Sequence, residues 1–259
     1  MKQIVTTLFV LLFATQLQAQ SAQDIMNRAS AAIYYPGADV RGDVSMTIVD
    51  GQGRKRSRSL VLLRRNEGAA NADQQMYIYF TRPSDVNRTA FLVWKNTRGA
   101  DDRWMYLPAL DQVRRIAASD ERTSFVGSHF FYEDLSGRLP KEDRHDLVET
   151  NGTYYVMRSR PRKPGKVEFA SYGTYIERTS MIPTRMEFYK ADGTLYRVME
   201  VLAVNNIQGV PTVTQIRMTD NDMGGNTTLR YRNVRYGTGF GSDLFSERSL
   251  RAPPMEYLR

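Results

Sequence analysis

The sequence predicts a mainly β protein of the α+β class, in which an antiparallel meander sheet carries an N-terminal helix and a few short helices. Apolar and polar residues alternate with period two through most of the chain, as in residues 44–48, where Val, Met and Ile alternate with Ser and Thr. Short turns such as Asn151-Gly152 separate these runs. Parallel neighbours would need crossovers of a dozen residues or more, so the short connections favour antiparallel pairing.

The first residues are typical of an export signal. Lys2 precedes the apolar run Ile4 to Phe13, and Ala19 offers a small residue at the cleavage position. A buried N-terminal helix or an uncleaved anchor is the alternative, although a membrane span needs about 20 apolar residues. We therefore expect a cleaved signal peptide over 1–19 and one domain over 20–259, since no linker-like tract interrupts the rest.

The composition limits the chemistry and the partners of the mature chain. The sequence contains no cysteine, which excludes disulfides, thiolate metal ligands and lipid attachment at a cysteine. The formal net charge is +8, and it becomes +7 when Lys2, the one charged residue in positions 1–19, leaves with the signal. An exported protein rarely meets nucleic acid, so we expect the anionic partner to be an acidic membrane surface or a lipid headgroup.

The elements follow in a simple order. Ser21 is a candidate N-cap, and Pro36-Gly37 ends the helix that it begins. A hairpin over 43–65 turns at 50–53. Further strands are predicted at Gln74 to Thr81, Thr89 to Lys95, Arg103 to Leu107, Gln112 to Ala117, Asp146 to Thr150, Thr153 to Arg160, Tyr172 to Arg178, Thr184 to Lys190, Leu195 to Asn205, Thr212 to Asp220 and Thr227 to Tyr236.

Two segments lack the two-residue period. Residues 119–145 group four aromatic side chains and predict a short helix with flanking loops. Residues 241–254 predict one or two helical turns that stop at a proline pair. Both segments are candidates to cover a face of the sheet.

No catalytic or metal centre emerges from the residues. His129 and His145 lack the spacing of a zinc hydrolase, and no Gly-x-Ser-x-Gly nucleophile motif is present. The glycines of 237–242 lack a dinucleotide-loop context, and residues 219–226 lack the closing glutamate of a calcium loop. Adjacent acids are more often exposed loop residues than acid/base pairs. We expect no enzyme activity, no metal and no cofactor.

Arginines recur at two-residue spacing along several runs, so each set lies on one face of its strand. Either this face is simply solvated, or it forms a surface for anionic headgroups or a partner protein. The candidate residues are Arg54, Arg56, Arg58, Arg158, Arg160 and Arg162.

Two central runs are apolar on both faces. In 103–108 Trp104 and Tyr106 project opposite to Met105 and Leu107, and 75–80 repeats the pattern. Such strands need a cover on each side, either a helix or a ligand. Twelve methionines, Met1 included, add deformable apolar surface.

The stretch "DDRWMYLPALDQVRRI" (101–116), followed by "FVGSHFFYEDL" (125–135), resembles the outer-membrane lipoprotein-sorting proteins of the LolA-like superfamily, in particular the branch that accompanies transporters of the RND/MMPL type. The likeness runs over most of the mature chain. It implies a periplasmic carrier whose sheet curves into an open half-barrel, with helices partly closing an apolar concavity that holds acyl chains.

Two functions follow from these observations. The first is a monomeric periplasmic carrier that holds acyl chains of lipids or lipoproteins, delivers them between the inner and outer membranes with an RND-type permease, and touches anionic membranes transiently. The second is a ligand-free envelope interaction or sensor module that uses the same sheet. The cavity residues expected for the carrier are Met76, Ile78, Phe80, Trp94, Trp104, Tyr106, Phe125, Phe130, Phe131 and Tyr132.

Overall fold

The N-terminal helix begins where the cap residue predicts. In the computed structural model, which describes residues 21–259, α1 spans Ala22–Tyr34. The Ser21 hydroxyl accepts a hydrogen bond from the backbone N–H of Asp24 at 3.1 Å, which satisfies one of the free donors of the first turn. The predicted signal peptide and its cleavage near Ala19 lie outside the described residues.

Within residues 21–259, thirteen strands form one antiparallel sheet, as the alternating pattern predicts. Its order is β6-β5-β4-β3-β2-β1-β13-β12-β11-β10-β9-β8-β7. The strands are β1 Asp39–Asp50, β2 Lys55–Asn66, β3 Gln74–Arg82, β4 Ala90–Lys95, β5 Asp102–Leu107, β6 Gln112–Ile116, β7 Asp143–Thr150, β8 Tyr154–Pro161, β9 Ser171–Glu177, β10 Pro183–Tyr189, β11 Leu195–Ile207, β12 Val210–Asp220 and β13 Gly225–Tyr236.

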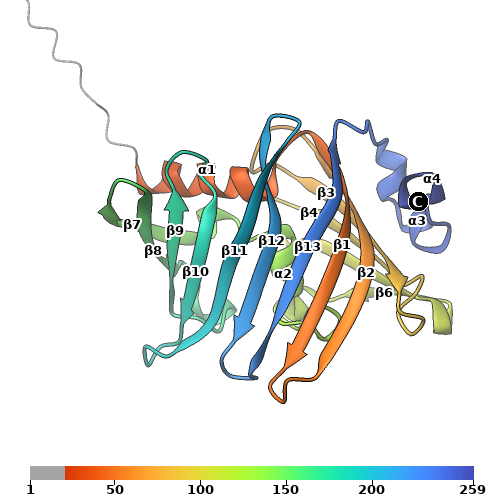
Figure 1. Ribbon diagram of the computed structural model, residues 1–259, viewed down its shortest axis with the longest axis horizontal. Helices are drawn as coiled ribbons and strands as arrows, with labels where there is room; N and C mark the ends of the chain where they lie inside the picture. Colours follow the sequence, from red (N-terminus) through yellow and green to blue (C-terminus); the bar gives the residue numbers. More distant parts are fainter. Residues whose placement is uncertain (1–20) are drawn as a thin grey trace, which may run out of the picture.

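The order of the strands shows two meanders that meet at β1. From β1 the chain moves strand by strand to β6 at one edge, then crosses to β7 at the other edge and returns strand by strand to β13, which pairs with β1. The sheet curves strongly, and the crossing segment, with the short helix α2 (Tyr132–Ser136), lies inside the curve (Figure 1). We call residues 117–142 the crossing segment. It covers the concave face because the chain must travel between two distant edges.

Apolar side chains are buried on both faces of the sheet. One cluster lies on the concave face beneath the crossing segment, and another lies between α1 and the β8–β11 region. A third lies on the outer face of β2–β5, beneath the C-terminal helices α3 (Glu247–Arg251) and α4 (Met255–Leu258) (Figure 1). The predicted fold class is confirmed. Between residues 21 and 259, no helix has the length and apolar character that a bilayer span requires.

Candidate functional site: an apolar cavity under the crossing segment

The curved sheet, α1 and the crossing segment enclose a cavity of about 200 Å³. A single water molecule needs about 10–15 Å³ of such space, so the concave face is far from filled by its own side chains. The lining comes from α1, from β1–β3 and β9–β13, and from the crossing segment. The cavity therefore depends on the closure of the whole fold rather than on any one loop.

Methionine is the commonest residue type in the lining, with six side chains. Methionine is unbranched and polarizable, so it packs against apolar surfaces of varied shape. The six come from six different elements, which surround the space with adaptable side chains. They are Met26, Met46, Met76, Met186, Met199 and Met218.

Four of the ten predicted cavity residues line this space: Met76, Ile78, Phe125 and Phe130. Phe80 and Tyr132 belong to the same buried cluster but stand behind the lining. The Phe125 ring centre lies 5.9 Å from that of Phe80 and 5.5 Å from that of Tyr132, so these aromatic rings brace the crossing segment against the sheet.

The structure places Trp94, Trp104 and Tyr106 on the other face, which corrects the expectation that they line the cavity. The Trp94 and Trp104 ring centres lie 4.9 Å apart, and the Trp94 indole N–H donates to the backbone carbonyl of Phe245 at 2.7 Å. The two-sided apolar pattern does require a second cover. That cover is the C-terminal segment rather than a ligand.

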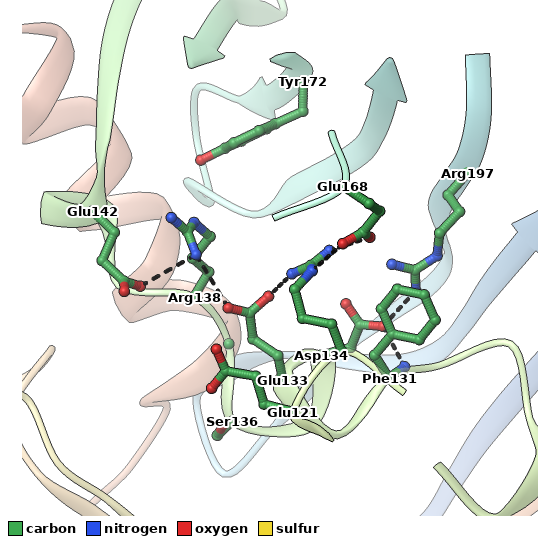
Figure 2. Close-up of polar contacts among 12 residues, drawn as sticks. Glu121, Phe131, Glu133, Asp134, Ser136, Arg138, Glu142, Glu168, Tyr172 and Arg197 are labelled. Atoms are coloured by element: carbon green, nitrogen blue, oxygen red, sulfur yellow. Dashed lines mark hydrogen bonds and ion pairs between the residues drawn. The ribbon is translucent and has the colours of Figure 1, made fainter. Parts of the chain in front are cut away.

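Phe131 does not line the cavity. It belongs to the set of contacts that Arg197 makes with α2 and the residues before it. Arg197, fully buried on β11, stacks its guanidinium 3.7 Å from the Phe131 ring centre and forms an ion pair with Asp134 at 2.5 Å (Figure 2). It also donates to the carbonyl of His129 at 3.0 Å. One arginine of the sheet thus holds three successive parts of the crossing segment.

A second set of ion pairs holds the same helix from its other side. Glu133 pairs with Arg122. It also pairs with Arg138 at 3.2 Å (Figure 2). Arg138 also pairs at 3.0 Å with Asp143, which is fully buried at the start of β7. The Tyr172 hydroxyl donates to Asp143 at 2.7 Å, and burial, followed by the Asp143 charge, raises the tyrosine pKa well above its usual value. These groups form a satisfied polar wall at one part of the cavity.

The last turn of α2 rests on a buried lysine. Lys95 of β4 is 2% exposed, and its ammonium donates to the carbonyls of Ser136 at 2.5 Å and Gly137 at 2.7 Å. Burial lowers the Lys95 pKa to about 8. A cation at this end of the helix complements its free carbonyl groups.

The predicted arginine surface divides between the two faces of the sheet. Leu60 faces the cavity, so Arg58 and Arg56 lie on the concave side, and Arg58 donates to the carbonyl of Val126. Arg54 is in the β1–β2 turn, paired with Asp50 at 2.7 Å.

On β8 the arginines lie on the outer face of the sheet instead. Met157 is buried toward α1, so Arg158 and Arg160 are exposed on the outer side, and Arg160 pairs with Asp146 at 2.8 Å. Arg162 donates to backbone carbonyls instead. The six arginines do not form one continuous surface.

Sequence reasoning missed most of the lining, including all of its charged residues, of which Arg64 is one. Arg64 lines the apolar space from β2 and is 7% exposed. A signal was present, because Arg64 continues the two-residue period of Leu60 and Leu62, which face the cavity.

A family model described as "Uncharacterized protein" matches residues 72–252, more than half of the chain. No curated protein matches the chain. Among solved structures, a DUF1329 family protein from Desulfovibrio piger is 27% identical with a TM-score of 0.80, over 88% of this chain and 97% of that one. An outer membrane lipoprotein-sorting protein domain from Vibrio parahaemolyticus is 26% identical with a TM-score of 0.79, over 89% and 98%. A LolA superfamily protein from Nitrosomonas europaea is 19% identical with a TM-score of 0.67, over 89% and 99%.

Proposed function

Since the chain belongs to the family that its matching model describes as "Uncharacterized protein", and since it has the LolA-like fold of outer membrane lipoprotein-sorting domains, we propose that it is a periplasmic carrier of acyl chains. The cargo is a lipid or a lipoprotein, carried between the inner and outer membranes. The carrier acts without chemistry of its own: it binds, shields and releases.

The observation that carries this proposal is the unfilled, methionine-rich cavity on the concave face. Each methylene moved from water into such a site contributes about 0.8 kcal/mol, so the cavity can return to a long chain much of the free energy that the chain loses on leaving a membrane. A ligand-free interaction module has no reason to keep this space open. The cavity therefore favours the carrier over the module.

The crossing segment supplies the means of entry and release. It is fixed at its ends to opposite edges of the sheet, and its middle is held by ion pairs and aromatic contacts. If the crossing segment moves away from the sheet, water can solvate the charged groups that its ion pairs release. The strands cannot separate in this way without losing their backbone hydrogen bonds. We also propose an RND/MMPL-type transporter as the partner. This is supported by the resemblance of residues 101–116 and 125–135 to the branch of LolA-like proteins that accompanies such transporters.

The test is displacement of a fluorescent fatty acid from the purified mature protein. Met218 lines the cavity, so Met218→Trp fills part of the space and is expected to weaken probe binding by tenfold or more. Leu147, 41% exposed on β7 and outside the lining, gives the matched control Leu147→Trp, which is expected to bind as wild type. Thermal unfolding of each variant separates loss of folding from loss of binding. If the wild-type protein binds no acyl probe, the carrier function is excluded.

A further inference from the structure

Arg64 is the one cavity-lining arginine, within the described residues, that has no carboxylate partner. Its neighbours across the sheet are Val40 of β1 and Met76 of β3, both of which also line the cavity. The two other arginines of the lining, Arg122 and Arg138, each pair with carboxylates. A buried cation without an anion is costly, so an unpaired buried arginine in a cavity needs an explanation.

The hydrogen bonds of Arg64 leave part of its guanidinium free. One terminal nitrogen donates to the carbonyl of Pro36 at 3.0 Å, just beyond the end of α1. The Nε–H is buried and finds no acceptor among residues 21–259. A guanidinium offers five donors in a planar fork that fits the two oxygens of a carboxylate or phosphate.

Two tyrosines lie near Arg64 in the lining. Tyr231 and Tyr236 line it from β13, and both lie close enough to interact electrostatically with Arg64. The Tyr236 hydroxyl shares a 2.8 Å hydrogen bond with Thr212 of β12. Burial raises the pKa of Tyr231 to about 12, so this hydroxyl stays protonated and can donate.

Arg64 keeps its charge at neutral pH. Burial lowers its pKa to about 10, still about three units above pH 7. Lining residues on the same strands, such as Leu62 and Val44, are apolar and offer a surface to hydrocarbon. The site therefore combines one anion receptor with a surface for hydrocarbon.

We propose that Arg64 binds the anionic oxygen headgroup of an amphiphile, a carboxylate or a phosphate, whose acyl chain lies against the methionines of the cavity. This assignment rests on the carrier function proposed above and adds the class of ligand. The headgroup lies at the end of the cavity beside the end of α1, because Arg64, Pro36 and Tyr236 all belong to that part of the lining. An uncharged chain of the same length lacks the partner that Arg64 needs.

The experiment compares three ligands of equal chain length by competition with a fluorescent fatty acid: palmitate, hexadecyl phosphate and the neutral hexadecanol. The wild-type protein is expected to prefer the better-fitting anion over hexadecanol by about tenfold or more, the scale of a charge-assisted hydrogen-bond pair. The palmitate and phosphate arms show which oxygen acid fits.

Arg64→Met removes the charge at nearly constant length and is expected to abolish this preference while hexadecanol still binds. Removing an unpaired buried charge is also expected to leave the melting temperature unchanged or raised. Arg56→Met, on the same strand and face but exposed and outside the lining, is the charge-matched control and is expected to keep the preference. Arg64→Gln, which retains a donor for Pro36, replaces the methionine variant if that one does not fold.

The outcomes are distinguishable. Equal binding of all three ligands by the wild-type protein, or equal weakening of all three by Arg64→Met, overturns the role of Arg64 and leaves the carrier function standing, and the second result assigns Arg64 to anchoring the end of α1. Absence of binding by any ligand overturns the carrier function and this assignment together.

Discussion

Arg197 and Phe131 form the tightest cation–ring contact in the described part of the chain, with 3.7 Å between the guanidinium carbon and the ring centre. Arg197 belongs to the sheet and Phe131 to the crossing segment, so this contact joins the wall of the cavity to its cover. The ion pair of Arg197 with Asp134 completes the junction. Substitutions at these side chains therefore measure how strongly the crossing segment is held to the sheet.

Asp134→Asn is expected to lower the free energy of unfolding by about 3 kcal/mol, because it leaves the fully buried Arg197 charge without its anion. Urea unfolding measures this loss. The control is Asp146→Asn, which breaks the exposed pair with Arg160 and is expected to cost about 1 kcal/mol or less. Equal costs for the two variants would contradict the anchoring role of Arg197.

Trp94→Phe is expected to lower stability by about 1–2 kcal/mol, because the carbonyl of Phe245 loses its donor on the outer face. Binding of the acyl probe is expected to stay at the wild-type level, since Trp94 does not line the cavity. Probe titration and urea unfolding of the same sample check both results. A variant that folds normally but loses probe affinity would show that Trp94 contributes to the binding site.

Lys95 makes stability depend on alkaline pH in a defined direction. Its pKa in the folded protein is about 8, below the value of 10.5 of an ordinary lysine, so the unfolded chain binds more protons between these values. The free energy of unfolding is therefore expected to rise with pH above about 8, by at most about 1.4 kcal/mol per pH unit from this group. The measurement is the difference between wild type and Lys95→Met at pH 7, 8, 9 and 10. A difference that is flat over this range would show that Lys95 titrates normally.

The exposed arginines of β8 provide a test of membrane contact. The double variant Arg158→Gln and Arg160→Gln is expected to weaken binding to vesicles with anionic lipids, and added salt is expected to weaken wild-type binding similarly. Arg162 is left in place because it supports backbone carbonyls. Arg54→Gln with Arg56→Gln removes the same charge from the turn and the concave side. If both double variants bind equally, net charge alone accounts for the attraction.

The strands could be predicted because their information is local. A two-residue period survives wherever one face of a strand is buried, and turns such as Asn151-Gly152 mark the ends. The same local pattern correctly separates Met76 and Ile78 from Tyr77 and Tyr79. It also shows that a strand such as 102–107 needs covers on both sides.

What the pattern does not contain is the identity of each cover. Trp104 and Tyr106 meet residues such as Phe240 and Phe245, which lie more than a hundred positions further along the chain. Only the completed sheet brings that segment to the outer face. The arginines divide between the two faces for another reason. Which face an arginine occupies depends on the alternation within its own strand, and the alternation of β2 does not determine that of β8, which lies far from it in the sheet.

The junction of β1 with β13 also determines how the chain must assemble. Asp39 accepts hydrogen bonds from Thr238, 199 residues away, and from Gly239, whereas every other neighbouring pair of strands is joined by a short stretch of chain. Closing so long a loop carries the largest entropic cost in the sheet. We therefore expect the two halves, β1–β6 and β7–β13, to form locally first and to pair late in folding. Until they pair, the edges of β1 and β13 are open to association with other chains.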